Sequence, residues 1–183
     1  MLILGSGSPR RKELLALATD LPFEVKVSAV DEEAITAENA FLLVQKLAAA
    51  KAAAVAAECP GDIVIGCDTV VDLDGAVLGK PADREEARAM IRALSGREHL
   101  VHTGVCIRQG DRADTFAETT RVEFYPLSDE EIEAYISTPE PYDKAGAYAV
   151  QGGAARYVKQ LVGCYFNVMG LPVSAVYRHL SAF

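Results

Sequence analysis

The segment from Ile63 to Val71 constrains the fold more than any other part of this chain. Its β-branched side chains form a continuous apolar run, which is typical of a strand that is buried on both faces of a sheet. Helical and strand patterns follow one another along the chain without a strict βαβ order, and residues 98–124 are predicted to form two long antiparallel strands. We therefore predict an α/β fold in which a mixed β-sheet is flanked by helices.

Asp68 interrupts this apolar run. An ionised carboxylate inside a buried strand is unfavourable unless it is paired or bound to a cation. Gly66, just before it, allows a backbone or a ligand to approach closely. Two interpretations are open, a functional carboxylate and a structural aspartate that caps a neighbouring element, and the chemistry favours the functional one.

The N-terminus is predicted to form a strand at Leu2–Leu4, a short loop and then a helix. Ser8 is a good N-cap, and Pro9 suits the first helical position. Three cations occupy the first turn of this helix: Arg10, Arg11 and Lys12. Cations at that end of a helix are unfavourable by about 0.3–1 kcal/mol each. Either an anion such as a phosphate sits opposite them, or they form a solvated basic turn.

Composition bounds the class of protein. The chain has 183 residues, half of them hydrophobic, which predicts one globular domain over residues 1–183. A net charge of −8 argues against a general nucleic-acid binder. The spacing of the four cysteines matches neither a C-x-x-C pair nor a zinc site, which indicates a reducing, cytosolic setting. We find no signal peptide and no apolar stretch of the ~20 residues that a membrane span needs.

Three further polar features are open to two interpretations each. The acidic cluster Asp31–Glu33 is either a solvated turn or a source of metal ligands, because hard cations take carboxylate oxygens. Lys51 is the only cation in an alanine-rich helical run, where a lone lysine is usually a surface residue. Lys80 is a turn lysine or, one hairpin away from Asp68, a second cation facing the same cleft.

Residues 139–152 favour irregular structure. Pro139 and Pro141 exclude a helix there, and the small residues from Tyr142 to Gly152 predict a loop, a strand and a second loop.

Four motifs, spread over both ends and the middle of the chain, resemble the Maf family of nucleoside triphosphate pyrophosphatases, and the resemblance covers nearly the whole chain. They are Ser-Gly-Ser-Pro-Arg-Arg-x-Glu-Leu-Leu at 6–15, Gly-x-Asp-Thr at 66–69, Asp-Lys-Ala-Gly-x-Tyr-x-x-Gln-Gly at 143–152 and Asn-x-x-Gly-Leu-Pro at 167–172. The resemblance implies an elongated sheet around a central cleft, related to the inosine triphosphate pyrophosphatase fold. It also implies an enzyme, for which the cysteines indicate a cytoplasmic location. Family members are often homodimers, but nothing in this sequence marks an interface.

The resemblance also assigns roles to residues. The implied reaction cuts a nucleoside triphosphate between its α- and β-phosphates, with Asp68 as the catalytic proton acceptor. A divalent cation, Mg²⁺ or Mn²⁺, is implied on Asp68 and Glu32. Substrate selection is assigned to Thr69, Gln151 and in part Arg10. The triphosphate would be held by Ser8, Arg10, Arg11, Lys51 and Lys80.

The third motif is similar to the branch of the family that acts on dTTP and UTP. The amide of Gln151 both donates and accepts hydrogen bonds, which suits a uracil or thymine edge. Two alternatives are a 7-methyl-GTP pyrophosphatase and a non-catalytic nucleotide-binding regulator of septum formation. Cys67 stands where alanine is common in the family, so activity is expected to be sensitive to oxidation.

Overall fold

The computed structural model describes all 183 residues, and its contacts divide the chain into two compact units. The first unit comprises Met1–Thr69, His102–Glu118 and Phe166–Phe183. The second unit comprises Val70–Val101 and Thr119–Tyr165. The assignment of residues 1–183 to one domain stays a prediction, and each unit is described by itself.

The strands form a mixed sheet, as predicted. It has seven strands, in the order β2-β1-β3-β5-β6-β7 with β4 paired to β3. Strand β1 is parallel to β2 and β3, whereas β4 is antiparallel to β3 and β7 is antiparallel to β6. The bounds are β1 Leu2–Leu4, β2 Phe23–Val25, β3 Ile63–Leu73, β4 Ala76–Leu78, β5 Glu98–Gln109, β6 Arg112–Phe124 and β7 Val158–Val162.

Polar side chains cap the N-termini of three helices. The side chains of Ser8, Asn39 and Ser128 each accept a hydrogen bond from a backbone N–H in the first turn of the helix that follows. The α-helices are α1 Pro9–Ala18, α2 Ala40–Glu58, α3 Arg84–Leu94, α4 Asp129–Ile136, α5 Tyr165–Met169 and α6 Val173–Leu180. Four 3-10 helices are η1 Glu32–Ala34, η2 Glu140–Asp143, η3 Ala145–Ala147 and η4 Gly153–Tyr157.

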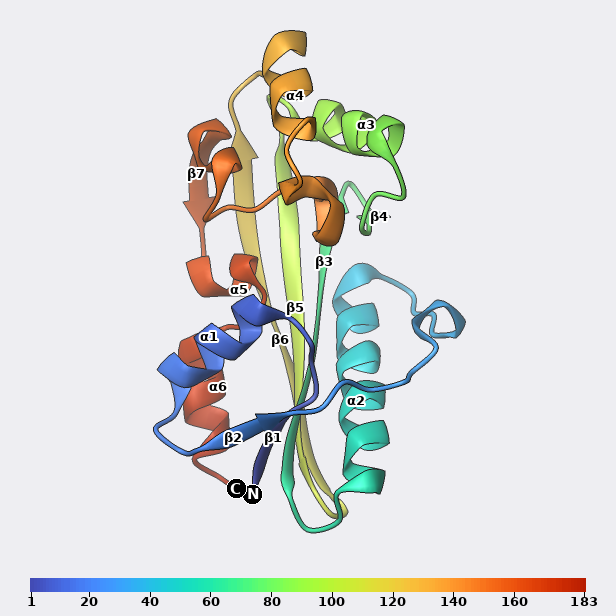
Figure 1. The fold of residues 1–183 in the computed structure, drawn as a ribbon, viewed down its shortest axis with the longest axis vertical. Coiled ribbons are helices and arrows are strands. Elements are labelled where there is room, and N and C mark those ends of the chain that lie inside the picture. Colours follow the sequence, from blue (N-terminus) through green and yellow to red (C-terminus); the bar gives the residue numbers. More distant parts are fainter. The chain divides into compact units, whose positions relative to one another are not determined.

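In the first unit, α2 lies on one side of β3, and α1 and α6 lie on the other (Figure 1). Alternate side chains of β3 enter two different cores on these two sides. Val64 packs on one face, in a cluster with residues of α2. Ile65 and Cys67 pack on the opposite face, in a cluster with residues of α1 and α6. Because the side chains of a strand alternate, Asp68 belongs to the α2 face and Thr69 to the face of α1 and α6.

Two glycines bring α2 unusually close to the sheet. An added Cβ on Gly66 would lie 2.3 Å from the Ala48 carbonyl oxygen and 2.6 Å from the Ala52 nitrogen. An added Cβ on Gly104 of β5 would lie 2.2 Å from the Val44 carbonyl oxygen. The backbone of α2 therefore rests on positions where any other residue would place a side chain.

The length of α2 corrects one expectation. With 19 residues and a mean hydropathy of 1.5, it is long and apolar enough to cross a membrane by length and composition. It nevertheless buries Val44, Ala48, Ala52 and Val55 together with Lys51 inside the first unit. The alanines of α2 favour helix and permit its close packing on the sheet.

In the second unit, α3 packs against α4, and aromatic rings fill the space beside β5. His99 is 2% exposed, and its Nε2 lies 2.6 Å from the Tyr148 hydroxyl, while its Nδ1 has no hydrogen-bond partner. The ring of His99 meets Phe124 edge-on, at 5.3 Å between centroids. Burial lowers the pKa of His99 to about 4, so this imidazole is neutral in the folded protein.

Residues 139–152 differ from the predicted loop-strand-loop. The segment forms the 3-10 helices η2 and η3, and the prolines stand at the start of η2 rather than excluding helical turns. Gly146 and Ala147 have φ angles of 69° and 63°, which are incompatible with an extended strand. An added Cβ on Gly146 would lie 2.7 Å from Val71, so close packing requires glycine at this turn.

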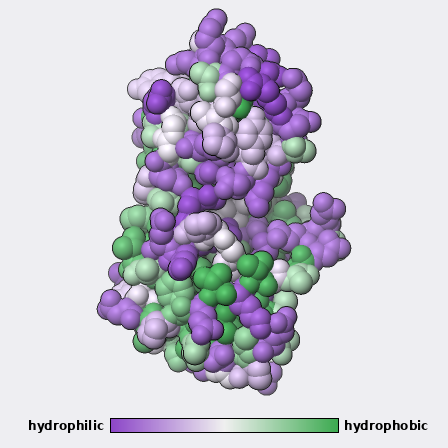
Figure 2. Space-filling model, viewed as in Figure 1, coloured by the Kyte–Doolittle hydropathy of each residue, from purple (hydrophilic) through white to green (hydrophobic).

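The exposed side chains differ between the two units. In Figure 2, the surface over α3 and α4 is mainly hydrophilic, whereas apolar side chains gather on the first unit. Exposed apolar residues there include Leu17, Leu21, Val25 and Val27.

Candidate active site

A lysine and two carboxylates form the most buried charged cluster of the first unit. Lys51 Nζ donates a hydrogen bond to Asp68 Oδ1 at 2.7 Å and lies 3.0 Å from Glu32 Oε1. The side chains of Lys51 and Asp68 are only 10% and 12% exposed. The interpretation of Lys51 as a surface residue is therefore wrong. Its burial is possible because each buried charge has an opposite charge as its partner.

The geometry of this cluster follows from the packing of α2. Asp68 lies two residues after Gly66 on the same face of β3, and Lys51 lies next to Ala52, whose backbone rests on Gly66. Glu32 comes from η1, a separate segment, and its side chain is 55% exposed. The predicted solvated acidic turn thus also supplies one carboxylate to Lys51.

The donor set of this cluster fits a divalent cation. Glu32 and Asp68 already share one positive charge, the Lys51 ammonium, so both carboxylates reach the same small region. No group of three or more histidine, cysteine, aspartate or glutamate side chains is placed to hold a metal ion. Mg²⁺ is commonly bound by one or two carboxylates together with substrate phosphates and water, and this pair meets that requirement.

Arg11 is anchored on the opposite face of the sheet. Its Nε donates to the Gly170 carbonyl at 2.8 Å, its Nη1 donates to Ser6 Oγ at 3.2 Å and its Nη2 donates to Thr69 Oγ1 at 3.0 Å. A guanidinium has five N–H groups, so two remain for an anion. Ser6 and Gly170 were not singled out from the sequence, although both fall inside motifs of the resemblance.

The hydroxyl of Thr69 belongs to a directed chain of hydrogen bonds. Thr103 Oγ1 donates its only proton to the Asn167 carbonyl at 2.9 Å. Thr69 Oγ1, 2.8 Å from Thr103 Oγ1, must therefore donate to it while accepting from Arg11. Thr69 can offer a ligand only its methyl group or an acceptor lone pair, and its predicted role in substrate selection stays a prediction.

The N-terminus of α1 has the features of an anion site. Ser8 Oγ accepts from the Arg11 N–H at 3.5 Å, and the Ser8 N–H donates to Ser6 Oγ at 3.3 Å. No acidic residue stands in the first turn to offset Arg10, Arg11 and Lys12. The dipole and these cations together favour a bound anion at this end of α1.

Two predicted site residues belong to the second unit. Lys80 follows β4 and is exposed, and Gln151 is exposed at a turn between η3 and η4. Their predicted contacts with the triphosphate and with the base stay predictions.

Cys67 does not have the surroundings of an oxidation-sensitive thiol. Its side chain is 0% exposed, and burial raises its pKa, against the smaller opposing effects of Arg11 and Lys51. Because the thiolate is the form that reacts, a buried thiol of raised pKa is inert. All four cysteines are free, and Cys106 is also buried.

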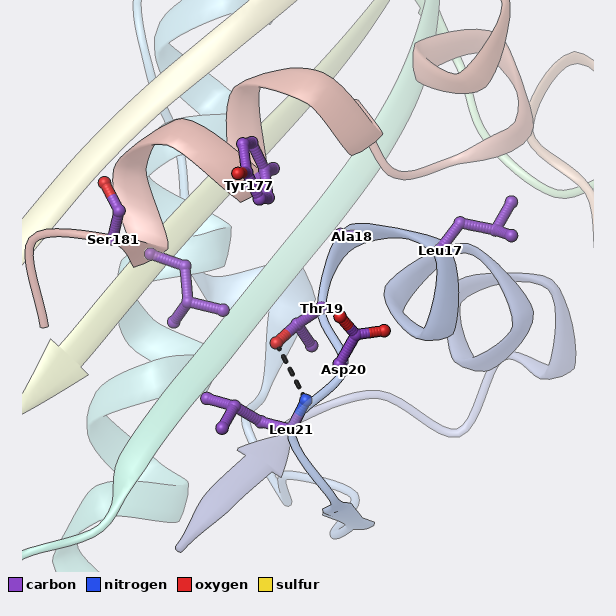
Figure 3. A pocket seen from close by; sticks show the side chains of 8 residues that line it. Leu17, Ala18, Thr19, Asp20, Leu21, Tyr177 and Ser181 are labelled. Carbon is purple, nitrogen blue, oxygen red and sulfur yellow. Dashed lines mark hydrogen bonds between the residues drawn. The ribbon is translucent and has the colours of Figure 1, made fainter.

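A separate open groove of about 410 Å³ lies between the end of α1 and α6 (Figure 3). Leu17, Leu21 and Tyr177 contribute apolar side chains, and the Leu21 N–H donates to Thr19 Oγ1 at 3.1 Å. Asp20 is the only charged residue that lines it. The groove contains no predicted site residue and no cation for a phosphate.

Comparison with known proteins gives the context for this site. The chain is 50% identical to the dTTP/UTP pyrophosphatase of Symbiobacterium thermophilum, over 100% of this chain and 93% of that protein. It is also 50% identical to the dTTP/UTP pyrophosphatase of Bacillus velezensis and 46% identical to that of Bacillus mycoides, over 96% and 95% of their lengths. The chain covers nearly all of each relative.

Among solved structures, a HAM1 protein from Coxiella burnetii has a similar fold. The TM-score is 0.54 at 14% identity, over 100% of this chain and 98% of that chain. This likeness confirms the predicted fold class. The family model described as "Maf-like protein" matches residues 1–183. With motifs at both ends and in the middle, and a full-length family match, the chain belongs to the Maf family.

Proposed function

We propose that this protein hydrolyses dTTP and UTP to the nucleoside monophosphate and pyrophosphate. The observation that carries the proposal is the 46–50% identity, over the whole chain, to proteins named dTTP/UTP pyrophosphatase. The charge distribution agrees with it. An acidic protein concentrates cations at the start of α1 and buries one lysine beside a carboxylate.

Lys51 and Asp68 would change partners when the substrate binds. Triphosphate oxygens compete for the Lys51 ammonium, because charge-assisted hydrogen bonds to phosphate are strong. Asp68, released from Lys51, would accept a proton from the attacking water as a general base. The ion pair would thus hold both groups in place until the substrate separates them.

The remaining cations would bind the triphosphate. Ser8 and the N-terminal N–H groups of α1 would receive one phosphate, with the two unused N–H groups of Arg11 beside them. Arg10 and Lys80 would bind further phosphate oxygens. Gln151 would contact the uracil or thymine edge, and Thr69 would contribute to selection of the base.

Glu32 and Asp68 would hold a divalent cation, Mg²⁺ or Mn²⁺. Such an ion would neutralise charge that develops on the phosphates. Four free cysteines fit a reducing, cytoplasmic location for the enzyme.

A panel assay tests the proposal. Purified protein with Mg²⁺ or Mn²⁺ would be given dTTP, UTP, CTP, 7-methyl-GTP, ITP and the common purine triphosphates, with pyrophosphate and orthophosphate counted separately. Pyrophosphate from dTTP and UTP, without orthophosphate, is the expected result. Release from 7-methyl-GTP alone would overturn the substrate assignment, and tight binding without turnover would favour a nucleotide-binding regulator.

A further inference from the structure

The turn that carries Gln151 is closed by one short backbone contact. The Gly152 N–H donates to the Ala149 carbonyl at 3.1 Å, which makes Val150 and Gln151 the two central residues of the turn. Val150 is buried and Gln151 is exposed. The side chain of Gln151 is thus presented outward from a turn whose other central residue is fixed in the core.

Glu140 and Tyr135 hold this turn from both sides. The Gly153 N–H donates to both carboxylate oxygens of Glu140, at 3.0 and 3.1 Å. Tyr135 Oη donates to Glu140 Oε2 at 2.5 Å and accepts from the Ala149 N–H at 3.1 Å. One carboxylate and one phenol therefore fix the residues on each side of the Gln151 turn.

Three features show that this clamp is built into the second unit. Tyr135 is 4% exposed, and burial together with Glu140 raises its pKa, so the phenol stays protonated and remains a donor. An added Cβ on Gly152 would lie 1.8 Å from Glu140 Oε1, so the carboxylate occupies the place of a side chain. Prolines on both sides of Glu140 restrict its backbone.

We infer that Tyr135 and Glu140 are positioning residues for Gln151 and thereby control which nucleobase the enzyme accepts. This inference rests on the proposed function, in which Gln151 contacts the base. Neither residue needs to touch the nucleotide. By holding the turn in one conformation, they remove the conformational entropy that Gln151 would otherwise lose on binding a base.

Steady-state kinetics of Tyr135→Phe and Glu140→Gln test the inference. Both variants should raise KM for UTP about tenfold, the size of one well-made hydrogen bond, with kcat near the wild-type value. Their preference for UTP over CTP should fall. Tyr142→Phe is the matched control, because it removes a phenol bond to the Ile136 carbonyl (2.6 Å) in the same unit.

A double-mutant cycle separates positioning from general damage. In a Gln151→Ala background, Tyr135→Phe should cause no further loss of preference for UTP over CTP, because the positioned group is already gone. Full additivity would overturn the inference. So would a loss in kcat at unchanged KM, or a Tyr135→Phe variant that behaves like Tyr142→Phe.

The failure of the proposed function has a different signature. Wild-type protein without dTTP or UTP turnover overturns both. Wild-type turnover of dTTP and UTP with base preference unchanged in Gln151→Ala overturns the inference and the contact of Gln151 with the base, and leaves the proposed hydrolysis standing. Amide hydrogen exchange provides a readout independent of turnover. Exchange at Ala149 and Gly153 should be faster in both variants than in Tyr142→Phe, and unchanged exchange would overturn the clamp.

Discussion

Asp68 and Thr69 are neighbours in β3, yet their side chains enter separate polar networks on opposite faces of the sheet. Asp68 Oδ1 accepts from Lys51 of α2 at 2.7 Å, whereas Thr69 Oγ1 accepts from Arg11 of α1 at 3.0 Å. Because successive side chains of a strand point to opposite faces, β3 places a carboxylate–lysine pair and an arginine–hydroxyl chain one residue apart.

The first prediction concerns the proton acceptor. Asp68→Asn should lower turnover about 10²–10⁴-fold, the usual contribution of a general base, because an amide cannot take the proton from water. Nucleotide binding, measured by calorimetry, should survive. Asp62→Asn is the control, since Asp62 pairs only with the exposed N-terminal ammonium. Turnover at the wild-type level in Asp68→Asn would refute the assignment.

The second prediction concerns the approach of α2 to the sheet. Gly66→Ala should destabilise the protein by about 2–4 kcal/mol, because its Cβ would overlap the backbone of α2 at Ala48. Denaturant unfolding measures the change. Gly79→Ala should be nearly neutral in the same experiment, as its added Cβ meets nothing within 4 Å. Equal free energies of unfolding for Gly66→Ala and the wild type would show that α2 can move away from the sheet without loss of stability.

The third prediction concerns the pH dependence of stability. His99 is buried and neutral, with a pKa of about 4, whereas an unfolded histidine binds a proton near pH 6.5. Between these pH values the unfolded state binds more protons than the folded state. The contribution of His99 to the free energy of unfolding is therefore complete above pH 6.5, and it falls by about 3 kcal/mol in all as the pH drops to 4.

Thermal or denaturant unfolding at several pH values would measure this contribution of His99. His99→Gln should flatten the curve between pH 4 and 6.5, because glutamine does not titrate. If the free energy of unfolding changes equally with pH in the wild type and in His99→Gln, groups other than His99 cause the change.

The fourth prediction reverses the expected oxidation sensitivity. Native protein treated with peroxide should keep its activity, because the Cys67 thiol is fully buried and its pKa is raised. An alkylating reagent followed by mass spectrometry should label the half-buried Cys59 before Cys67. Rapid labelling of Cys67 in the folded protein, with parallel loss of activity, would restore the original expectation.

Local chemistry determined much of the fold. Ser8 and Pro9 mark the start of α1, Asp74 and Gly75 form the turn between β3 and β4, and the apolar run around Asp68 forms the longest strand of the parallel region. These signals act over a few residues, through backbone dihedral preferences and side-chain periodicity. The motifs that identify the family are local in the same sense.

Tertiary structure alone decided which polar groups meet. Lys51 was ambiguous because only the packing of α2 on Gly66 decides whether its side chain faces solvent or Asp68. Thr69 and Thr103 are 34 residues apart, and no local pattern links their hydroxyls.

The turns at Gly146 and Ala147 show the same limit. Glycine permits both extended and left-handed backbone, and Gly146 takes the left-handed form at a place where an added Cβ would meet Val71. Ala147 also has a positive φ, which no local pattern predicts for alanine. Sequence patterns thus determined the elements and the residue types of the site. The contacts of its side chains depend on free energies of packing between distant segments, which no local pattern contains.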